Sequence, residues 1–189
     1  MNVKSIDKSN MFRIIYDFPV HIQESFKLFK ENHTLDSKEK FKNIESIVIL
    51  GMGGSAITGL LMKEILKDEI NIPISINQNY TLPKWVNKKT LIIASSYSGN
   101  TEETLTACKE GISKKCKIIG FSTGGKLVSL LKNKKYKNFV IMPNGLQPRA
   151  AIGYAFSMML LTLNQIGLIK MSMIKNLKNS IKILKKKSE

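Results

Sequence analysis

The sequence predicts an α/β protein whose core is a doubly wound, five-stranded parallel sheet with helices on both faces. Two observations predict this class. Short uncharged apolar runs recur between residues 46 and 142, as is typical of parallel strands that are covered on both faces. Segments of helical length alternate with these runs, which indicates crossover connections in a parallel sheet. We expect an N-terminal helical segment (1–45), the α/β domain (46–166) and a C-terminal amphipathic helix (167–189).

The first half of the chain contains two of the expected strands. Residues 11–45 are predicted to be helical, with a break near Pro19, because proline interrupts a helix. The β-branched run at 46–50 is the first expected strand, and an apolar helix over 56–66 follows it. Residues 72–76 form the second expected strand.

The second half contains the other three strands. Residues 91–94, 117–121 and 139–142 form the third, fourth and fifth expected strands, and all are uncharged except Lys117. A helical pattern follows the third strand. Asn100 stands three residues before Glu103, and this spacing predicts a capping box at the start of that helix.

Two further helices are expected near the C-terminus. Residues 150–169 carry no charge and are long enough to span a bilayer, but their polar side chains favour a buried core or interface helix. Residues 167–189 carry seven lysines against a single acid, with apolar residues at helical spacing. Such an amphipathic helix needs a partner surface, which is another domain, another subunit or, less favoured, an anionic membrane.

The charge balance bears on the class of partner. The net charge is +16, but only Arg13 and Arg149 of the 30 basic residues are arginine, and aromatic residues make up 7%. Nucleic-acid surfaces draw heavily on arginine and stacking aromatics. We therefore expect no nucleic-acid partner and no membrane, and we interpret the lysines as a solvated face that attracts anionic metabolites.

The cysteines and the N-terminus indicate a cytoplasmic location. Cys108 and Cys116 are too few for a disulfide framework or a metal site, so a reducing compartment is expected. Residues 1–10 are polar and lack the apolar region of a signal peptide.

A turn rich in hydroxyl groups follows the third expected strand. Ser96, Ser98 and Thr101 lie close together around Gly99 and Asn100, and a helical pattern begins next. The free N–H groups and the positive end of a helix dipole then face the turn. Each charge-assisted hydrogen bond contributes roughly 1.5–3 kcal/mol, so we predict a phosphate site here rather than an ordinary serine-rich turn.

A glycine-rich turn with Gly53, Gly54 and Ser55 follows the first expected strand. The run Gly-Met-Gly-Gly-Ser-Ala fits the G-x-G-x-x-G/A fingerprint of dinucleotide sites. Such a site also needs an acid about 20 residues further on, at the tip of the second strand. Residues 77–79 read Asn-Gln-Asn instead. The dinucleotide interpretation therefore fails. The glycines still predict a backbone that a ligand can approach closely, with the Ser55 hydroxyl beside it.

A second glycine run follows the fourth expected strand. Residues 120–127 nearly match the nucleotide motif G-x-x-x-x-G-K-[ST], but Leu127 stands where the Mg²⁺-binding hydroxyl is needed. We prefer a strand-to-helix turn whose glycines allow tight geometry. Lys126 stays a candidate contact for an anion.

Arg149 is the candidate catalytic residue. Pro148 is well placed to start a helix, and Arg149 lies in its first turn at the carboxyl edge of the fifth strand, where ligands bind in open α/β sheets. In a lysine-rich chain a lysine would have met a demand for charge alone. The arginine therefore indicates planar, forked hydrogen bonding; an incidental surface arginine is the alternative.

With these turns, the chain resembles the sugar isomerase (SIS) domain and, more narrowly, the N-terminal half of the bifunctional phosphoglucose/phosphomannose isomerases. The resemblance rests on Gly-Gly-Ser, Ser-Tyr-Ser-Gly-Asn-Thr and Pro-Arg-Ala-Ala-Ile-Gly-Tyr after the first, third and fifth strands. It covers nearly the whole chain. It implies interconversion of fructose 6-phosphate with glucose 6-phosphate or mannose 6-phosphate, without a metal or an organic cofactor.

The resemblance also implies roles for individual residues. The hydroxyl turn would hold the phosphate of the substrate through Ser96, Ser98, Gly99, Asn100 and Thr101. The glycine turn would lie close to the sugar through Gly53, Gly54 and Ser55. Arg149 would stabilise the negative charge of the enediolate, which is a role that suits a fixed guanidinium in a water-poor site.

The reaction also needs a base that moves the proton between C1 and C2 and an acid that opens the sugar ring. The resemblance implies that a glutamate, a histidine and a lysine of a second SIS domain take these roles, the histidine from the neighbouring subunit of a dimer. We therefore expect a homodimer or a second SIS domain as partner. His21 and His33 lie in no matching motif and are expected at the surface or at helix caps. A chain that ends at Glu189 is expected to be a binding half with little turnover alone; the alternative is a non-catalytic, regulatory phosphosugar-binding module.

Overall fold

The computed structural model describes residues 6–188, and its centre is a six-stranded sheet in the order β1-β6-β5-β4-β2-β3. Five strands pair in parallel, namely β2 (Ser46–Leu50), β3 (Ile74–Asn77), β4 (Thr90–Ser95), β5 (Lys117–Ser122) and β6 (Phe139–Ile141). The predicted doubly wound sheet is confirmed, and only its strand count is wrong. The sixth strand, β1 (His33–Thr34), pairs antiparallel with β6. A two-residue strand is too short to show an alternating pattern, so the sequence carries no signal for it.

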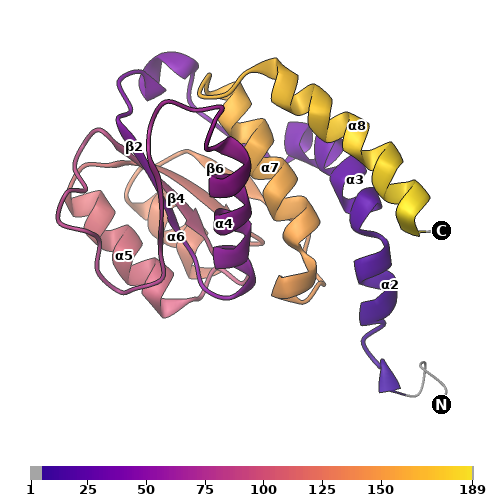
Figure 1. The fold of residues 1–189 in the computed structure, drawn as a ribbon. Helices are drawn as coiled ribbons and strands as arrows, with labels where there is room; N and C mark the ends of the chain where they lie inside the picture. Colours follow the sequence, from indigo (N-terminus) through magenta and orange to yellow (C-terminus); the bar gives the residue numbers. More distant parts are fainter. Residues whose placement is uncertain (1–5, 189) are drawn as a thin grey trace.

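Helices cover both faces of the sheet (Figure 1). One face packs against α5 (Glu102–Ser113) and α6 (Gly125–Asn133), and the other packs against α4 (Gly54–Leu66) and α7 (Ile152–Gln165). Successive strand residues point to opposite faces, so Ile92 belongs to the first core and its neighbour Ile93 to the second. This two-sided burial is the reason why the strands read as continuous apolar runs.

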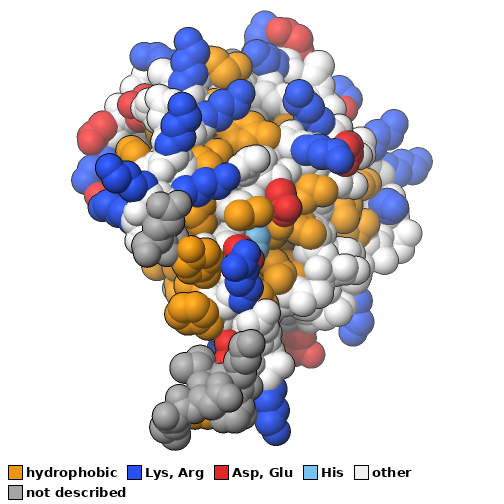
Figure 2. Space-filling view, turned by 90° about the vertical axis from the view of Figure 1, so that its right-hand side faces the viewer, with side chains coloured by type: hydrophobic (Ala, Val, Ile, Leu, Met, Phe, Trp, Pro, Cys, Tyr) orange, Lys and Arg blue, Asp and Glu red, His pale blue; other side chains and the backbone are white. Residues whose placement is uncertain are grey.

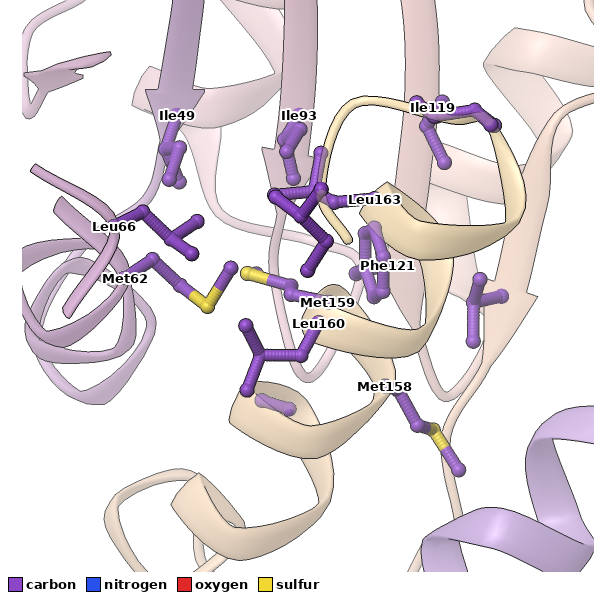
Figure 3. Close-up of a cluster of buried hydrophobic side chains, with 14 of the residues drawn as sticks. Ile49, Met62, Leu66, Ile93, Ile119, Phe121, Met158, Met159, Leu160 and Leu163 are labelled. Carbon is purple, nitrogen blue, oxygen red and sulfur yellow. The ribbon is translucent and has the colours of Figure 1, made fainter. Parts of the chain in front are cut away.

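The core under α4 and α7 is the larger of the two. Met62 of α4 and Met159 of α7 lie against Ile49 and Ile93 of the central strands (Figure 3). All four side chains are 0–1% exposed. Burying a side chain of this size contributes about 1.5–3 kcal/mol, so these contacts hold α4 and α7 firmly on the sheet.

The N-terminal region is less helical than predicted. This region contains the α-helices α2 (Met11–Tyr16) and α3 (Phe18–Glu31). Strand β1 and a 3-10 turn, η1 (Lys38–Phe41), follow them in place of further α-helix. The predicted break is confirmed: the chain leaves helical geometry at Asp17, and Pro19 lies in the first turn of α3. Proline is tolerated there because the first N–H groups of a helix have no intrahelical partner.

The uncharged helix α7 is a core helix, as predicted. Met158 and Met159 are fully buried, and the Thr162 hydroxyl donates a hydrogen bond of 2.8 Å to the carbonyl of Met158. That internal bond lets a polar side chain lie in an apolar layer. Among residues 6–188, no helix is long and apolar enough to cross a membrane.

The C-terminal helix α8 (Met171–Ser188) packs on α3 and α7 of the same chain. Met173, Ile174 and Leu177 are buried in this contact, so the chain itself supplies the partner surface that an amphipathic helix needs. Figure 2 shows the outer side of this region, where blue lysine and arginine side chains are spread widely and red acidic ones are few.

The order of the strands defines where a ligand can enter. β2 is flanked by β3 on one side and by β4 on the other, so the chain reverses its direction of travel across the sheet between them. The loops after β2 and β4 therefore leave to opposite faces, and in open α/β sheets the carboxyl edge at such a point is where ligands bind. The glycine turn and the hydroxyl turn of the sequence are these two loops.

Candidate functional site

The loop after β4, residues 96–101, is called the phosphate loop below. The hydroxyls of Ser96 and Thr101 lie 2.8 Å apart, and the Ser96 hydroxyl also accepts a long hydrogen bond of 3.5 Å from the Thr101 N–H. The exposed Ser98 hydroxyl accepts 3.2 Å from the N–H of Asn100. The structure thus brings two of the three predicted hydroxyls into contact and keeps the third on the same turn.

Helix α5 begins directly after this loop, at Glu102, with Thr101 as its N-cap residue. Its first amides have no intrahelical partner and carry the positive end of the helix dipole. The predicted capping box is wrong, because the Asn100 side chain bonds elsewhere. Its amide donates 3.1 Å to the Ser98 carbonyl, and its oxygen accepts 3.2 Å from the N–H of Lys126.

The glycine run after β5 clamps the phosphate loop. The Leu127 N–H donates 2.9 Å to the Gly99 carbonyl, which adds to the bond from the Lys126 N–H to Asn100. A Cβ atom at Gly99 would lie 2.0 Å from the carbonyl oxygen of Gly124. The first amides of α6 are therefore used to hold the phosphate loop, which supports the strand-to-helix turn over a nucleotide site.

Tyr97 is a residue of this site that the sequence did not reveal. Its side chain is 9% exposed; its phenol donates 2.8 Å to the Pro143 carbonyl and accepts 3.0 Å from the Leu146 N–H. Burial raises the pKa of Tyr97 above its ordinary value. No local signal in the sequence marks this role, because the two hydrogen-bond partners of the phenol lie 46 and 49 positions further along the chain.

The glycine turn after β2 touches the loop that carries Arg149. A Cβ atom at Gly54 would lie 3.0 Å from the Cα of Arg149 and 3.0 Å from the carbonyl oxygen of Pro148. Gly53 has a φ of 51°, which favours glycine. Ser55 lies half-buried in the first turn of α4. The predicted glycine and arginine motifs are therefore direct neighbours in space.

Arg149 lies in a 3-10 turn, η2 (Pro148–Ala150), that follows β6 and precedes α7. Pro148 starts this short turn rather than the α-helix itself. The guanidinium is exposed and donates 2.6 Å to the side-chain oxygen of Gln147. The guanidinium thus lies exposed at the carboxyl edge of the sheet, on a backbone that packs against Gly54.

His21 of α3 and Tyr154 of α7 are buried side chains that form a group with the exposed Glu24. The His21 ring stacks on Tyr154 with ring centres 4.5 Å apart, and the Tyr154 phenol donates 2.5 Å to Glu24. His21 is 7% exposed, so its expected surface position is wrong, and burial lowers its pKa. His33 contacts the Phe29 carbonyl at the end of α3, which fits the expected capping role.

The described residues offer an anion site more readily than a metal site. Within residues 6–188, no three His, Cys, Asp or Glu side chains gather as metal ligands would. The phosphate loop instead supplies hydroxyls and helix N-terminal amides, which favour a phosphate. At +16 the net charge also favours the approach of anions.

Several curated proteins are similar in sequence. A bifunctional phosphoglucose/phosphomannose isomerase of Caldicellulosiruptor bescii is 42% identical over 160 residues, which is 85% of this chain and 46% of that protein. One of Thermoplasma volcanium is 37% identical over 71% of this chain and 42% of its own length. A D-glucosamine-6-phosphate 4-epimerase of Sulfolobus acidocaldarius is 34% identical over 77% of this chain and 46% of its own. This chain therefore spans about half the length of these relatives.

Solved structures share the fold at lower identity. The C-terminal domain of glucosamine-fructose-6-phosphate aminotransferase from Francisella tularensis matches with a TM-score of 0.67 and 18% identity over 92% of this chain and 52% of that one. The Vibrio vulnificus NanR protein complexed with ManNAc-6P matches with a TM-score of 0.60 and 17% identity over 95% of this chain and 70% of that one. The sequence matches no protein-family model. The chain is thus a homologue of the bifunctional phosphoglucose/phosphomannose isomerases that has the fold of the phosphosugar isomerase (SIS) domain.

Proposed function

We propose that this chain is the phosphosugar-binding half of an aldose–ketose isomerase that interconverts glucose 6-phosphate or mannose 6-phosphate with fructose 6-phosphate. One observation carries the proposal. The hydroxyl-lined phosphate loop and the Gly54–Arg149 contact lie at the carboxyl edge of the sheet, around the point where the strand order reverses. The relatives named as isomerases support the reaction class.

The roles follow from the chemistry of each group. Ser96, Ser98 and Thr101 hold the phosphate with the backbone of Gly99 and Asn100 and the first amides of α5. Gly53, Gly54 and Ser55 line the sugar, because glycines let the ligand approach the backbone. Arg149 stabilises the charge that develops on the enediolate oxygen; one such preorganised donor is worth about 2.7–4 kcal/mol in the transition state.

A second SIS domain completes the site in this proposal, either in a homodimer or in a longer polypeptide. That second domain supplies the base and the ring-opening acid. Residues 46–166 are the first SIS domain in this proposal, and α8 follows them toward the second. The outer face of α4 supports a partner here, since Ile57, Leu60, Leu61 and Ile65 are 40–50% exposed and the helix begins at the glycine turn. A strictly monomeric chain in light scattering would contradict the homodimer form.

The reaction needs no metal or organic cofactor in this proposal, since acid–base groups and a guanidinium suffice to move one proton between C1 and C2. A cytoplasmic location is part of it. Two free, buried cysteines support a reducing compartment.

The alternative is a phosphosugar-binding module without turnover. One finding favours keeping it. A protein with this fold, NanR, is described in complex with ManNAc-6P rather than as an isomerase. The same phosphate loop would serve both functions, and only a catalytic assay divides them.

Thermal shift with fructose 6-phosphate tests the binding that both functions share. A ligand at 100 times its Kd stabilises a protein by about 2.7 kcal/mol, which raises the melting temperature of a chain of this size by about 5–10 °C. No shift at millimolar ligand would contradict both functions. A coupled assay for glucose 6-phosphate then distinguishes them, and we expect little turnover from this chain alone.

The variant Arg149→Lys tests the assigned role of the guanidinium. We expect the affinity for fructose 6-phosphate to change less than about threefold, and any isomerase activity to fall by about 10²-fold, because the group acts on the transition state. Arg13→Lys is the matched control, since Arg13 is exposed and pairs with Asp17. Loss of sugar binding in Arg149→Lys would show that its role is misassigned.

A further inference from the structure

Tyr97 connects the phosphate loop to the loops that follow β5 and β6. Its phenol binds the Pro143 carbonyl and the Leu146 N–H, both in the loop between β6 and η2. Its own carbonyl accepts 3.0 Å from the Thr123 N–H and 2.9 Å from the Thr123 hydroxyl, in the loop after β5. One residue of the phosphate loop thus fixes the position of both neighbouring loops.

The connection continues to the candidate catalytic group. Leu146 precedes Gln147, whose side chain accepts the bond from the Arg149 guanidinium. On its other side the backbone of Arg149 rests against Gly54. The path from the phosphate loop to the backbone of Arg149 therefore runs through a single buried phenol and the main chain of residues 146–148.

We propose that Tyr97 is a positioning residue that sets the distance between the phosphate loop and Arg149. The inference rests on the proposed function. When the phosphate of a sugar is bound by the phosphate loop, the C1 and C2 atoms lie at a fixed distance from that loop. The guanidinium stabilises the enediolate only if it lies at the same distance. A misplacement of about 1 Å costs up to 10²-fold in such an arrangement, so a rigid connection between the two groups matters.

The test compares two ligands that differ at one end. Arabinitol 5-phosphate offers the phosphate and the polyol chain, and 5-phosphoarabinonate adds a carboxylate where the enediolate charge would form. Their Kd ratio, measured by calorimetry, reports the contribution of Arg149 apart from phosphate binding. In Tyr97→Phe we expect the affinity for arabinitol 5-phosphate to stay within about twofold and the preference for the aldonate to fall about tenfold.

A double-mutant cycle shows whether the effect acts through the arginine. In an Arg149→Lys background, Tyr97→Phe should cause no further fall in the ratio, because the group that it positions is gone. Tyr136→Phe is the matched control, as its half-buried phenol likewise donates to a carbonyl, that of Cys116, and it should leave the ratio unchanged.

A measurement on the wild-type chain covers the case in which Tyr97→Phe does not fold. The Leu146 amide should exchange its hydrogen more slowly with 5-phosphoarabinonate bound than with arabinitol 5-phosphate bound. Equal exchange with both ligands, or an unchanged Kd ratio in a folded Tyr97→Phe, would overturn the inference. Failure of the wild-type chain to bind either ligand would overturn the proposed function instead.

Discussion

Single glycines decide how closely the loops of the site approach one another. Gly99 has a φ of 71°, in the left-handed region that favours glycine, and it faces the Gly124 carbonyl. Gly54 faces the backbone of Arg149 in the same way. In both places a side chain would separate two segments whose contact builds the site, so the requirement is steric and local.

The variant Gly99→Ala should lose both stability and phosphosugar binding. A left-handed alanine costs roughly 1–2 kcal/mol, and the added Cβ would also lie 2.0 Å from the Gly124 oxygen. We expect a fall in melting temperature of about 4 °C or more, measured by circular dichroism, together with loss of the shift caused by fructose 6-phosphate.

Gly145→Ala is the control for this prediction. Gly145 has a φ of 90°, but no atom lies within 4 Å of the position that its Cβ would take. Gly145→Ala should therefore lose only the stability that a left-handed alanine costs, and fructose 6-phosphate should still raise its melting temperature. Equal behaviour of the two variants would mean that the close approach at Gly99 is unimportant.

At the level of elements, local chemistry accounts for most boundaries. β2 and β4 lie where their apolar runs predict them. β3 starts at Ile74 rather than at residue 72, because Pro73 has no N–H to donate to the sheet. The end of α3 and strand β1 escaped prediction, since β1 exists only by pairing with β6.

The packing of α5 on the sheet should protect both cysteines. Cys108 of α5 and Cys116 before β5 are 0% and 2% exposed, and burial raises their pKa to about 12 and about 11. At pH 8 we expect both thiols to react with Ellman's reagent at least about 100-fold more slowly than in the unfolded chain, because the thiolate is the reactive form. Equal rates would mean that α5 is loosely attached.

The same shifts predict the direction of a pH effect. The folded state binds these two thiol protons more tightly than the unfolded state, whose ordinary pKa is 9.0. Their contribution to stability is therefore complete below pH 9 and is lost as the pH rises toward the folded-state values of about 11 and about 12. Melting temperatures between pH 8 and pH 11 measure it; Cys108→Ala should reduce the fall.

At the scale of the whole molecule, the net charge of +16 should assist phosphosugar binding. Long-range attraction is screened by salt, with a Debye length of about 8 Å at physiological ionic strength and about 3 Å at 1 M. We expect the affinity for fructose 6-phosphate to fall about 3- to 10-fold between low salt and 0.5 M salt, as measured by calorimetry.

A variant at the opposite edge of the sheet tests whether remote lysines contribute to the affinity for fructose 6-phosphate. Lys84, Lys88 and Lys115 line a hollow at that edge, remote from the phosphate loop. Replacing all three with glutamine should leave the affinity within about twofold at physiological salt, because the separation exceeds the screening length. A salt-independent affinity in the wild type would contradict the electrostatic contribution.

Residue order alone was enough to place the parallel strands, the hydroxyl turn and the glycine turn, because each depends on chemistry within a few neighbouring positions. The placing of these turns at one edge of the sheet depended on three-dimensional packing. Tyr97 meets Leu146 across 49 positions and Tyr154 meets Glu24 across 130, and no local pattern marks such pairs. Contacts between remote segments form only when the strands assemble into the sheet. The burial of His21 and the hydrogen bonds of Tyr97 to a remote loop therefore become visible only in the folded chain.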